Sequence, residues 1–206
     1  KDFNIDKTHI RTENGDTASN RTYLTPDGDR YYKDDSWNGG VFSSFALSAS
    51  DRELLHSSDM VHTTFSGPNF NDVIDCCREK RFQLSVDFDI CRDFDTIEKY
   101  LDCISLLFIS GDEPTLEKAK QLSAKYPNTV FIVTLGENGS TAFSKCTAYH
   151  CAAAEVSEVT DTTGCGDSYQ AGFIASYLAD GNIETAMSKG SQTAAQTLSF
   201  IGGFRY

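Results

Sequence analysis

The fold is decided by residues 106–135, which read LLFISGDEPTLEKAKQLSAKYPNTVFIVTL. Two apolar runs, at residues 106–109 and 130–135, flank a helical segment at residues 113–126 that Pro127 ends. Neither apolar run alternates with polar residues, so each strand is expected to be covered on both faces. This stretch therefore predicts a strand–helix–strand unit from a parallel sheet that lies between two layers of helices.

The same alternation continues on both sides of this unit. Ser50, followed by Glu53 three residues later, has the pattern of a capping box and indicates a helix start. The other expected elements are strands at residues 60–65 and 84–88, helices at residues 69–80, 167–178 and 183–198, and a polar hairpin that pairs residues 140–143 with residues 147–151. Together they predict an α/β fold with three layers and a mainly parallel sheet.

The first forty residues differ in composition from the rest of the chain. They are polar, and residues 21–24 and 30–32 form two short runs of strand-forming side chains. A Pro-Asp-Gly turn at residues 26–28 separates them, which is typical of a hairpin because Pro fixes φ and Gly accepts a positive φ. We therefore expect a small projecting β segment at residues 1–40 and an α/β core at residues 41–206.

The charge balance narrows the choice of partners. The 206 residues include 30 acidic and 18 basic side chains, which gives a formal net charge of −12 and a pI near 4.6. Such a surface repels phosphate backbones and anionic lipid head groups, so neither nucleic acid nor a membrane surface is an expected partner. The sequence has no apolar run long enough to span a bilayer, and no GxGxxG segment typical of a dinucleotide-binding dehydrogenase.

The seven cysteines do not have the spacing of a metal site. None forms a CxxC pair, and no His lies at zinc-finger spacing from any of them. We expect reduced thiols in a cytoplasmic protein, several of them buried as small apolar side chains.

Residues 161–168, DTTGCGDS, are the strongest functional signal. Gly164 and Gly166 leave backbone N–H groups unshielded, and the helix that follows adds its own first N–H groups and dipole to an anion-binding cradle. Phosphate is the expected guest. A bound phosphate would repel the Asp167 carboxylate. The presence of Asp167 at this position is explained if its carboxylate accepts the proton of an attacking hydroxyl. The alternative is an ordinary glycine turn with Asp167 as the helix N-cap.

Two further turns follow expected strands. Residues 134–139, TLGENG, come at the carboxyl end of one strand, and residues 110–113, SGDE, come at the end of the preceding one. Open α/β sheets bind ligands at this edge, where the turns are expected to converge. The alternatives are a plain turn for the first and helix-capping carboxylates for the second, although Glu113 could also hold water around Mg²⁺.

These motifs resemble those of the PfkB (ribokinase-like) carbohydrate kinases. DTTGCGD is similar to the DTxGAGD signature of that family, with Cys165 in place of the usual Ala. TLGENG is similar to its nucleotide-binding TLGxxG segment, SGDE falls where the family has N-x-x-E, and the front hairpin resembles the lid over the sugar. The motifs cover essentially the whole chain, and residues 45–48, 134–140 and 201–203 are most similar to the fructoselysine 6-kinases within the family.

The resemblance implies a three-layer ribokinase-like fold and a role for each motif residue. Asp167 would be the catalytic base facing the substrate, and the backbone amides of Gly164, Cys165 and Gly166 would hold the transferring phosphoryl group. Thr134, Gly136 and Gly139 would contact the nucleotide, with Gln192 near the adenine, and Glu113 would bind Mg²⁺ through water. Asp161 and Thr163, with the loop at residues 202–203, would bind a monovalent cation such as K⁺. Asp34 and Asp35 would contact a charged substrate.

The implied function is an ATP-dependent kinase that transfers the γ-phosphate to a primary hydroxyl of a sugar, with the 6-hydroxyl of fructoselysine as the first candidate. The alternatives are a kinase for another sugar or a nucleoside, and a non-catalytic nucleotide-binding fragment. Ser110 replaces the Asn of N-x-x-E, and the family's first strands and sugar-binding segment have no counterpart here. We therefore expect a chain whose first segment is truncated, cleaved or missing, with lids that pair two copies.

Overall fold

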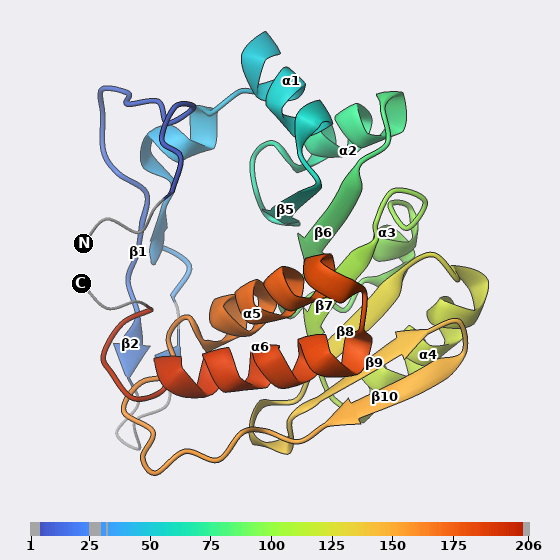
Figure 1. Cartoon of the computed structure of the whole chain (residues 1–206). Helices are drawn as coiled ribbons and strands as arrows, with labels where there is room; N and C mark the ends of the chain where they lie inside the picture. Colours follow the sequence, from blue (N-terminus) through green and yellow to red (C-terminus); the bar gives the residue numbers. More distant parts are fainter. Residues whose placement is uncertain (1–4, 25–29, 32, 204–206) are drawn as a thin grey trace.

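A six-stranded sheet forms the centre of the computed structural model, which describes residues 5–24, 30–31 and 33–203 (Figure 1). Its strands are β5 (Met60–Thr64), β6 (Gln83–Asp87), β7 (Leu106–Ser110), β8 (Val130–Thr134), β9 (Ser140–Ser144) and β10 (Thr147–Cys151), in the spatial order β10-β9-β8-β7-β6-β5. Strands β5 to β8 are parallel, as the sequence predicts. The predicted hairpin β9–β10 joins the same sheet through an antiparallel pairing of β9 with β8.

Helices cover both faces of this sheet. They are α1 (Ala49–Ser57), α2 (Phe70–Glu79), α3 (Phe94–Glu98), α4 (Glu113–Lys125), α5 (Cys165–Asp180) and α6 (Ile183–Thr197). Neighbouring strand residues point to opposite faces, so Leu107 packs with the core under α1 to α4 while Leu106 packs with the core under α5 and α6. Figure 1 shows α5 and α6 side by side on the front of the sheet. The predicted three-layer α/β fold is confirmed.

Most predicted elements are confirmed to within one or two residues, but the first helix begins earlier than expected. Ser48, not Ser50, is its N-cap, and the capping box closes with Asp51 instead of Glu53. The Ser48 side chain accepts a hydrogen bond from Asp51 N (3.2 Å), and Asp51 Oδ2 accepts one from Ser48 N (2.7 Å). Asp completes the box as Glu does, because its carboxylate also reaches back to the N-cap amide. Helix α3 is not predicted at all.

The front of the chain forms two small ladders apart from the main sheet. β1 (Ser19–Asn20) pairs with β4 (Trp37–Asn38), and β2 (Tyr23–Leu24) pairs with β3 (Arg30–Tyr31). This confirms the predicted hairpin strands, while the turn at residues 25–28 and Tyr32 lie outside the described residues. In Figure 1 the ladders lie to the left of the core. A short 3₁₀ helix, η1 (Gly40–Ser44), connects them to the core.

The described part of the chain contains no helix that is long and apolar enough to cross a membrane.

Candidate active site

The loop before α5 depends on a close approach between two glycines. Gly164 has a φ of +73°, and a Cβ there would lie 2.7 Å from the Cα of Gly203. Only glycine satisfies both conditions without strain. Gly166 differs, since its φ is not positive and a Cβ would meet open space. The positive φ in this loop therefore belongs to Gly164, and Gly166 keeps an ordinary helical backbone.

Asp161 holds this loop in shape. Its Oδ1 accepts hydrogen bonds from Thr163 N (2.9 Å) and Thr163 Oγ1 (2.8 Å), and its Oδ2 accepts one from Gly202 N (3.0 Å). Thr160 N also donates to Leu198 O (2.8 Å). The loop at residues 160–164 is thus fastened to the segment that follows α6.

Backbone N–H groups line the start of α5. Those of Gly164, Gly166 and Asp167 have no acceptor among the described residues, whereas Cys165 N donates to Thr162 O at 3.3 Å. Of the three amides predicted to form the cradle, those of Gly164 and Gly166 are therefore free, whereas that of Cys165 is engaged in the turn; anion binding by them stays a prediction. Free N–H groups at the positive end of a helix dipole favour an anion.

Asp167 is the third residue of α5 and is exposed. The N-cap position belongs to Gly164, so the alternative that Asp167 caps the helix is wrong. Its carboxylate is left free at the open end of the helix, beside the cradle.

Two more carboxylates lie near Asp167, and sequence reasoning missed both. Asp87 ends β6, and Asp89 follows it with a φ of +49° and an N–H that donates to Asp87 Oδ1 (2.8 Å). Loss of water around Asp89 and the charges of Asp87 and Asp167 raise the pKa of Asp89. Desolvation lowers the pKa of His62 on β5, and the same two charges oppose that shift. The signal available in the sequence was two Asp residues at and just past the carboxyl end of an apolar strand, at the edge where open sheets bind ligands.

The ends of β7 and β8 bring the two other predicted turns together. Ser110 pairs with Thr134, and Gly111 N donates to Thr134 O at 2.9 Å. Asp112 is the N-cap of α4 and accepts from Thr115 N (3.1 Å) and Oγ1 (2.7 Å), so the capping alternative holds for that carboxylate. Glu113 is exposed in the first turn with no partner among the described residues.

The two glycines of the TLGENG turn do different work. Gly139 has a φ of +81° and packs so tightly that a Cβ would collide with Cys151 O. Gly136 has a φ of +60°, but nothing lies within 4 Å of the place a Cβ would occupy. Packing therefore requires glycine at position 139, whereas Gly136 leaves open space on the surface of the turn.

Three predicted site residues lie elsewhere on the surface. Gln192 is exposed on α6, and Asp34 and Asp35 are exposed in the turn between β3 and β4. Ser36 fixes that turn by accepting from Lys33 N (2.7 Å). No described contact connects these three residues to the cradle.

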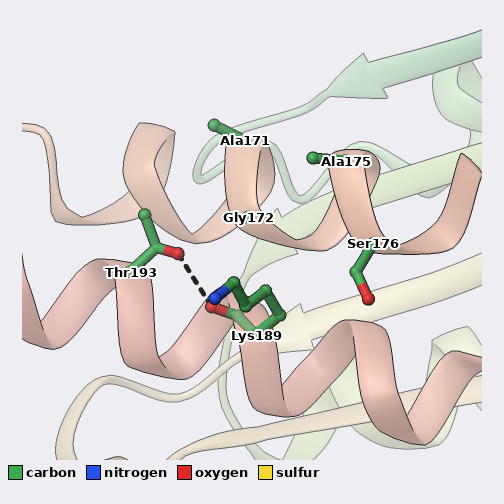
Figure 2. Close-up of a pocket in the computed structure, with 6 residues that line it drawn as sticks. All are labelled: Ala171, Gly172, Ala175, Ser176, Lys189 and Thr193. Carbon is green, nitrogen blue, oxygen red and sulfur yellow. Dashed lines mark hydrogen bonds between the residues drawn. The ribbon is translucent and has the colours of Figure 1, made fainter. Parts of the chain in front are cut away.

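A hollow of about 490 Å³ between α5 and α6 is separate from these turns (Figure 2). It is lined by Ala171, Gly172, Ala175, Ser176, Lys189 and Thr193. A Cβ on Gly172 would lie 2.9 Å from Lys189 O, so glycine there allows the two helices to pack closely. None of the predicted site residues lines this hollow.

The family follows from a comparison with known proteins. Residues 2–203 match the model of the pfkB family carbohydrate kinases. The chain belongs to the pfkB family. The fructoselysine 6-kinase of Shigella flexneri is 33% identical to it over 203 residues, which are 97% of this chain and 76% of that protein. Members of this family are phosphotransferases that act on a sugar hydroxyl, with ATP as the phosphate donor.

Solved structures confirm the ribokinase-like fold of this pfkB family chain. The nucleoside kinase of Methanocaldococcus jannaschii, an archaeal member of the ribokinase family, matches with a TM-score of 0.70 and 21% identity over 93% of this chain and 64% of that one. Arabidopsis thaliana ribokinase, complexed with ribose and ATP, matches with a TM-score of 0.74 and 18% identity over 92% and 65%. The chain thus spans just under two thirds of the length of these two structures.

Proposed function

We propose that this chain provides the phosphoryl-transfer site of an ATP-dependent sugar kinase. The observation that carries the proposal is the open end of α5, where free N–H groups and the exposed carboxylate of Asp167 lie side by side. Helices α1, α3, α4 and α6 each have an N-cap side chain that accepts from one of their first N–H groups, whereas Gly164 offers α5 no such acceptor. A site that binds a phosphate and takes a proton from a hydroxyl needs both the free N–H groups and the carboxylate.

The proposed mechanism assigns Asp167 as the general base. Its carboxylate accepts the proton of the sugar hydroxyl while the hydroxyl oxygen forms a bond to the γ-phosphorus, and the bond from that phosphorus to the β–γ bridging oxygen breaks to release ADP. The N–H groups of Gly164 and Gly166 stabilise the charge on the transferring group. The Cys165 amide can join them once its 3.3 Å bond to Thr162 O is given up.

We propose nucleotide and cation contacts around this centre. Thr134, Gly136 and Gly139 would contact the nucleotide, with Gln192 near the adenine; the open space over Gly136 supports this. Carboxylates of the kind found at Asp87 and Glu113 suit Mg²⁺, which prefers oxygen ligands and keeps several waters. An Mg²⁺ ion held by these carboxylates would neutralise negative charge on the nucleotide phosphates. For K⁺, Asp161 and Thr163 offer oxygens, although Asp161 already accepts three hydrogen bonds from the loop.

The proposed substrate is a sugar with a primary hydroxyl, and fructoselysine phosphorylated at its 6-hydroxyl is the first choice because of the named relative at 33% identity. The second choice is another sugar or a nucleoside, since a solved neighbour is named a nucleoside kinase. Residues 1–40 would form the lid over residues 41–206, and the exposed Trp37 supports pairing of two lids. All seven cysteines are free, which supports a cytoplasmic enzyme.

A phosphorylation screen tests the proposal. The 206-residue chain would be incubated with ATP and Mg²⁺ and with fructoselysine, fructose, ribose or inosine, while ADP release and the ³¹P spectrum of the product are measured. We expect turnover with a ketoamine sugar. ATP binding without turnover on any acceptor would instead support the alternative of a non-catalytic nucleotide-binding chain.

Asp34 and Asp35 provide a test of the finer substrate proposal. We expect the double variant Asp34→Asn, Asp35→Asn to raise KM for fructoselysine several-fold, since an exposed pair with the substrate ammonium contributes about 0.2–1 kcal/mol for each contact. KM for fructose, which lacks the ammonium, should hardly change. Equal changes for the two sugars would remove both residues from the substrate site.

A further inference from the structure

A buried pair of hydroxyl groups lies between the nucleotide turn and α5. Ser140 Oγ and Tyr169 Oη are 2.8 Å apart, and both residues are more than nine-tenths buried. Ser140 begins β9 directly after Gly139 and pairs with Thr134, while Tyr169 follows Asp167 by two residues on α5. One hydrogen bond therefore connects the two segments that carry the proposed nucleotide contacts and the proposed base.

The surroundings of Tyr169 restrict it to this position. Its ring stacks on that of Phe173 with centroids 6.3 Å apart, and a Cβ on Gly190 of α6 would lie 3.1 Å from the ring and 2.8 Å from Tyr169 O. Burial raises the pKa of Tyr169, so the hydroxyl keeps its proton. A rigid aromatic side chain held on three sides transmits a displacement of its hydroxyl to the helix, because close-packed groups have no free space to absorb it.

The neighbouring residue is anchored as well. Thr197 Oγ1 of α6 donates to Ser168 Oγ at 2.7 Å, so the two residues after Asp167 are bonded to different elements. The hydrogen bond of Ser168 leads to α6, whereas the hydrogen bond of Tyr169 leads to Ser140, directly after the turn at residues 134–139.

We propose that Tyr169 and Ser140 are positioning residues, whose shared hydrogen bond aligns Asp167 with a nucleotide held at residues 134–139. The kinetic consequence rests on the proposed function, whereas the structural coupling does not. Neither side chain touches the reacting groups, since both are buried behind the turn and the helix.

Tyr169→Phe and Ser140→Ala test the link because each removes one hydroxyl and keeps most of the packing. We expect each to lower kcat about tenfold with KM for the sugar changed less than twofold, and the double variant to be no worse than either single one. The matched control is Thr129→Val at the opposite edge of the sheet, where Thr129 Oγ1 is equally buried and donates to Ile104 O at 2.7 Å. It should lower Tm and leave kcat within twofold.

Hydrogen exchange provides a readout that does not need turnover. Ser140→Ala should speed exchange of the amides at residues 168–170, and Tyr169→Phe should speed exchange at residues 134–140, with Thr129→Val changing neither. If the wild-type chain phosphorylates nothing, the proposed function fails and this measurement still decides the coupling. Unchanged exchange, or variants that lose Tm as Thr129→Val does while keeping kcat, would overturn the inference.

Discussion

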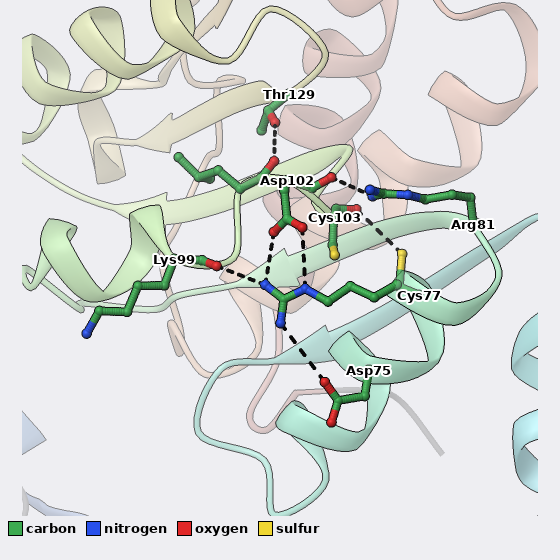
Figure 3. Close-up of polar contacts among 9 residues, drawn as sticks. Asp75, Cys77, Arg81, Lys99, Asp102, Cys103 and Thr129 are labelled. Carbon is green, nitrogen blue, oxygen red and sulfur yellow. Dashed lines mark hydrogen bonds and ion pairs between the residues drawn. The ribbon is translucent and has the colours of Figure 1, made fainter.

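Charged side chains are arranged differently at the two ends of the parallel strands, the edge where the strands begin and the edge where they end. At the edge where the strands begin, Arg78 of α2 holds Asp102 with two hydrogen bonds, Nε to Oδ2 at 3.3 Å and Nη2 to Oδ1 at 3.1 Å (Figure 3). The same guanidinium donates to Lys99 O (3.1 Å) and keeps the pKa of Asp102 below its usual range. At the edge where the strands end, loss of water and the charges of Asp87 and Asp167 raise the pKa of Asp89. Arg92 opposes this rise only in part, and it donates to Cys91 O (3.3 Å), not to a carboxylate.

The difference separates residues that hold the fold from residues that a ligand must complete. A carboxylate with a fitted guanidinium contributes to stability, although modestly when it is half exposed. Carboxylates gathered without such partners cost stability, and proteins keep such arrangements where protons, cations or substrates are to be bound. Charge pairing alone thus distinguishes the structural edge from the proposed active edge.

The largest expected effect comes from Asp167→Asn. The amide keeps the size of the carboxylate but cannot accept a proton, so turnover should fall by about 10²–10⁴-fold while ATP affinity is nearly unchanged. Steady-state kinetics and calorimetric titration with ATP measure both. Asp180→Asn, at the other end of the same helix, is the control and should keep full activity. Retention of more than about half of the wild-type kcat in Asp167→Asn would disprove the base assignment.

A second comparison sets two glycines of the cradle against each other. Gly166→Val should remove activity with little change in Tm, since the new side chain enters open space that the phosphate needs. Gly164→Val should also lower Tm. A residue with a Cβ in the left-handed backbone conformation costs roughly 1–2 kcal/mol, and this Cβ would also collide with Gly203. Thermal unfolding with and without ATP separates the two. Normal ATP affinity together with a large drop in Tm for Gly166→Val would make that glycine purely structural.

At the opposite edge, Asp102→Asn should destabilise the protein by about 0.2–1 kcal/mol and leave kcat unchanged. The folded-state pKa of Asp102 is depressed, so its stabilising contribution is present above the unfolded value of about 3.9 and disappears as pH falls through the folded value. Urea unfolding of both proteins at pH 7 and pH 3 measures this. The difference between them should shrink in acid, and a constant difference would show that the ion pair is not its cause.

The smallest expected effect has the opposite sign. Asp89→Asn should stabilise the protein by no more than about 0.5 kcal/mol at pH 7, since it removes a charge that partial loss of water and the neighbouring carboxylates both disfavour. With a raised folded-state pKa, ionised Asp89 costs stability at neutral pH, and this cost disappears once the pH falls below the unfolded value. The part of the gain that persists in acid would come from the φ of +49°, which Asn tolerates well. A loss of stability at pH 7 would contradict the charge argument.

The sequence was sufficient wherever a local pattern determines the structure. Apolar runs and the proline after α4 predict the strands and helices because burial and backbone sterics act over a few residues. The shift of the first capping box from Ser50 to Ser48 goes against the usual pattern, which ends in Glu or Gln. Asp51 of the observed box also forms an ion pair with Arg11 (3.1 Å), forty residues earlier in the chain, and the sequence gives no sign of that contact. The carboxylates at Asp87 and Asp89 were missed because their closeness to Asp167 arises from strands and helices nearly eighty residues apart in sequence. Whether a glycine needs a positive φ likewise depends on what packs against it, as Gly164 and Gly203 show.

The contact between Gly164 and Gly203 also has a consequence for biosynthesis. The loop before α5 is fastened by Leu198 O, Gly202 N and Gly203, which the ribosome adds some forty residues after the loop itself. Strands β5 to β8 can pair as they emerge, because their crossovers are already complete. The cradle cannot close until residue 203 has left the ribosome. A nascent chain would therefore carry paired strands, still uncovered on the face that α5 and α6 later pack against, before it could hold a phosphate.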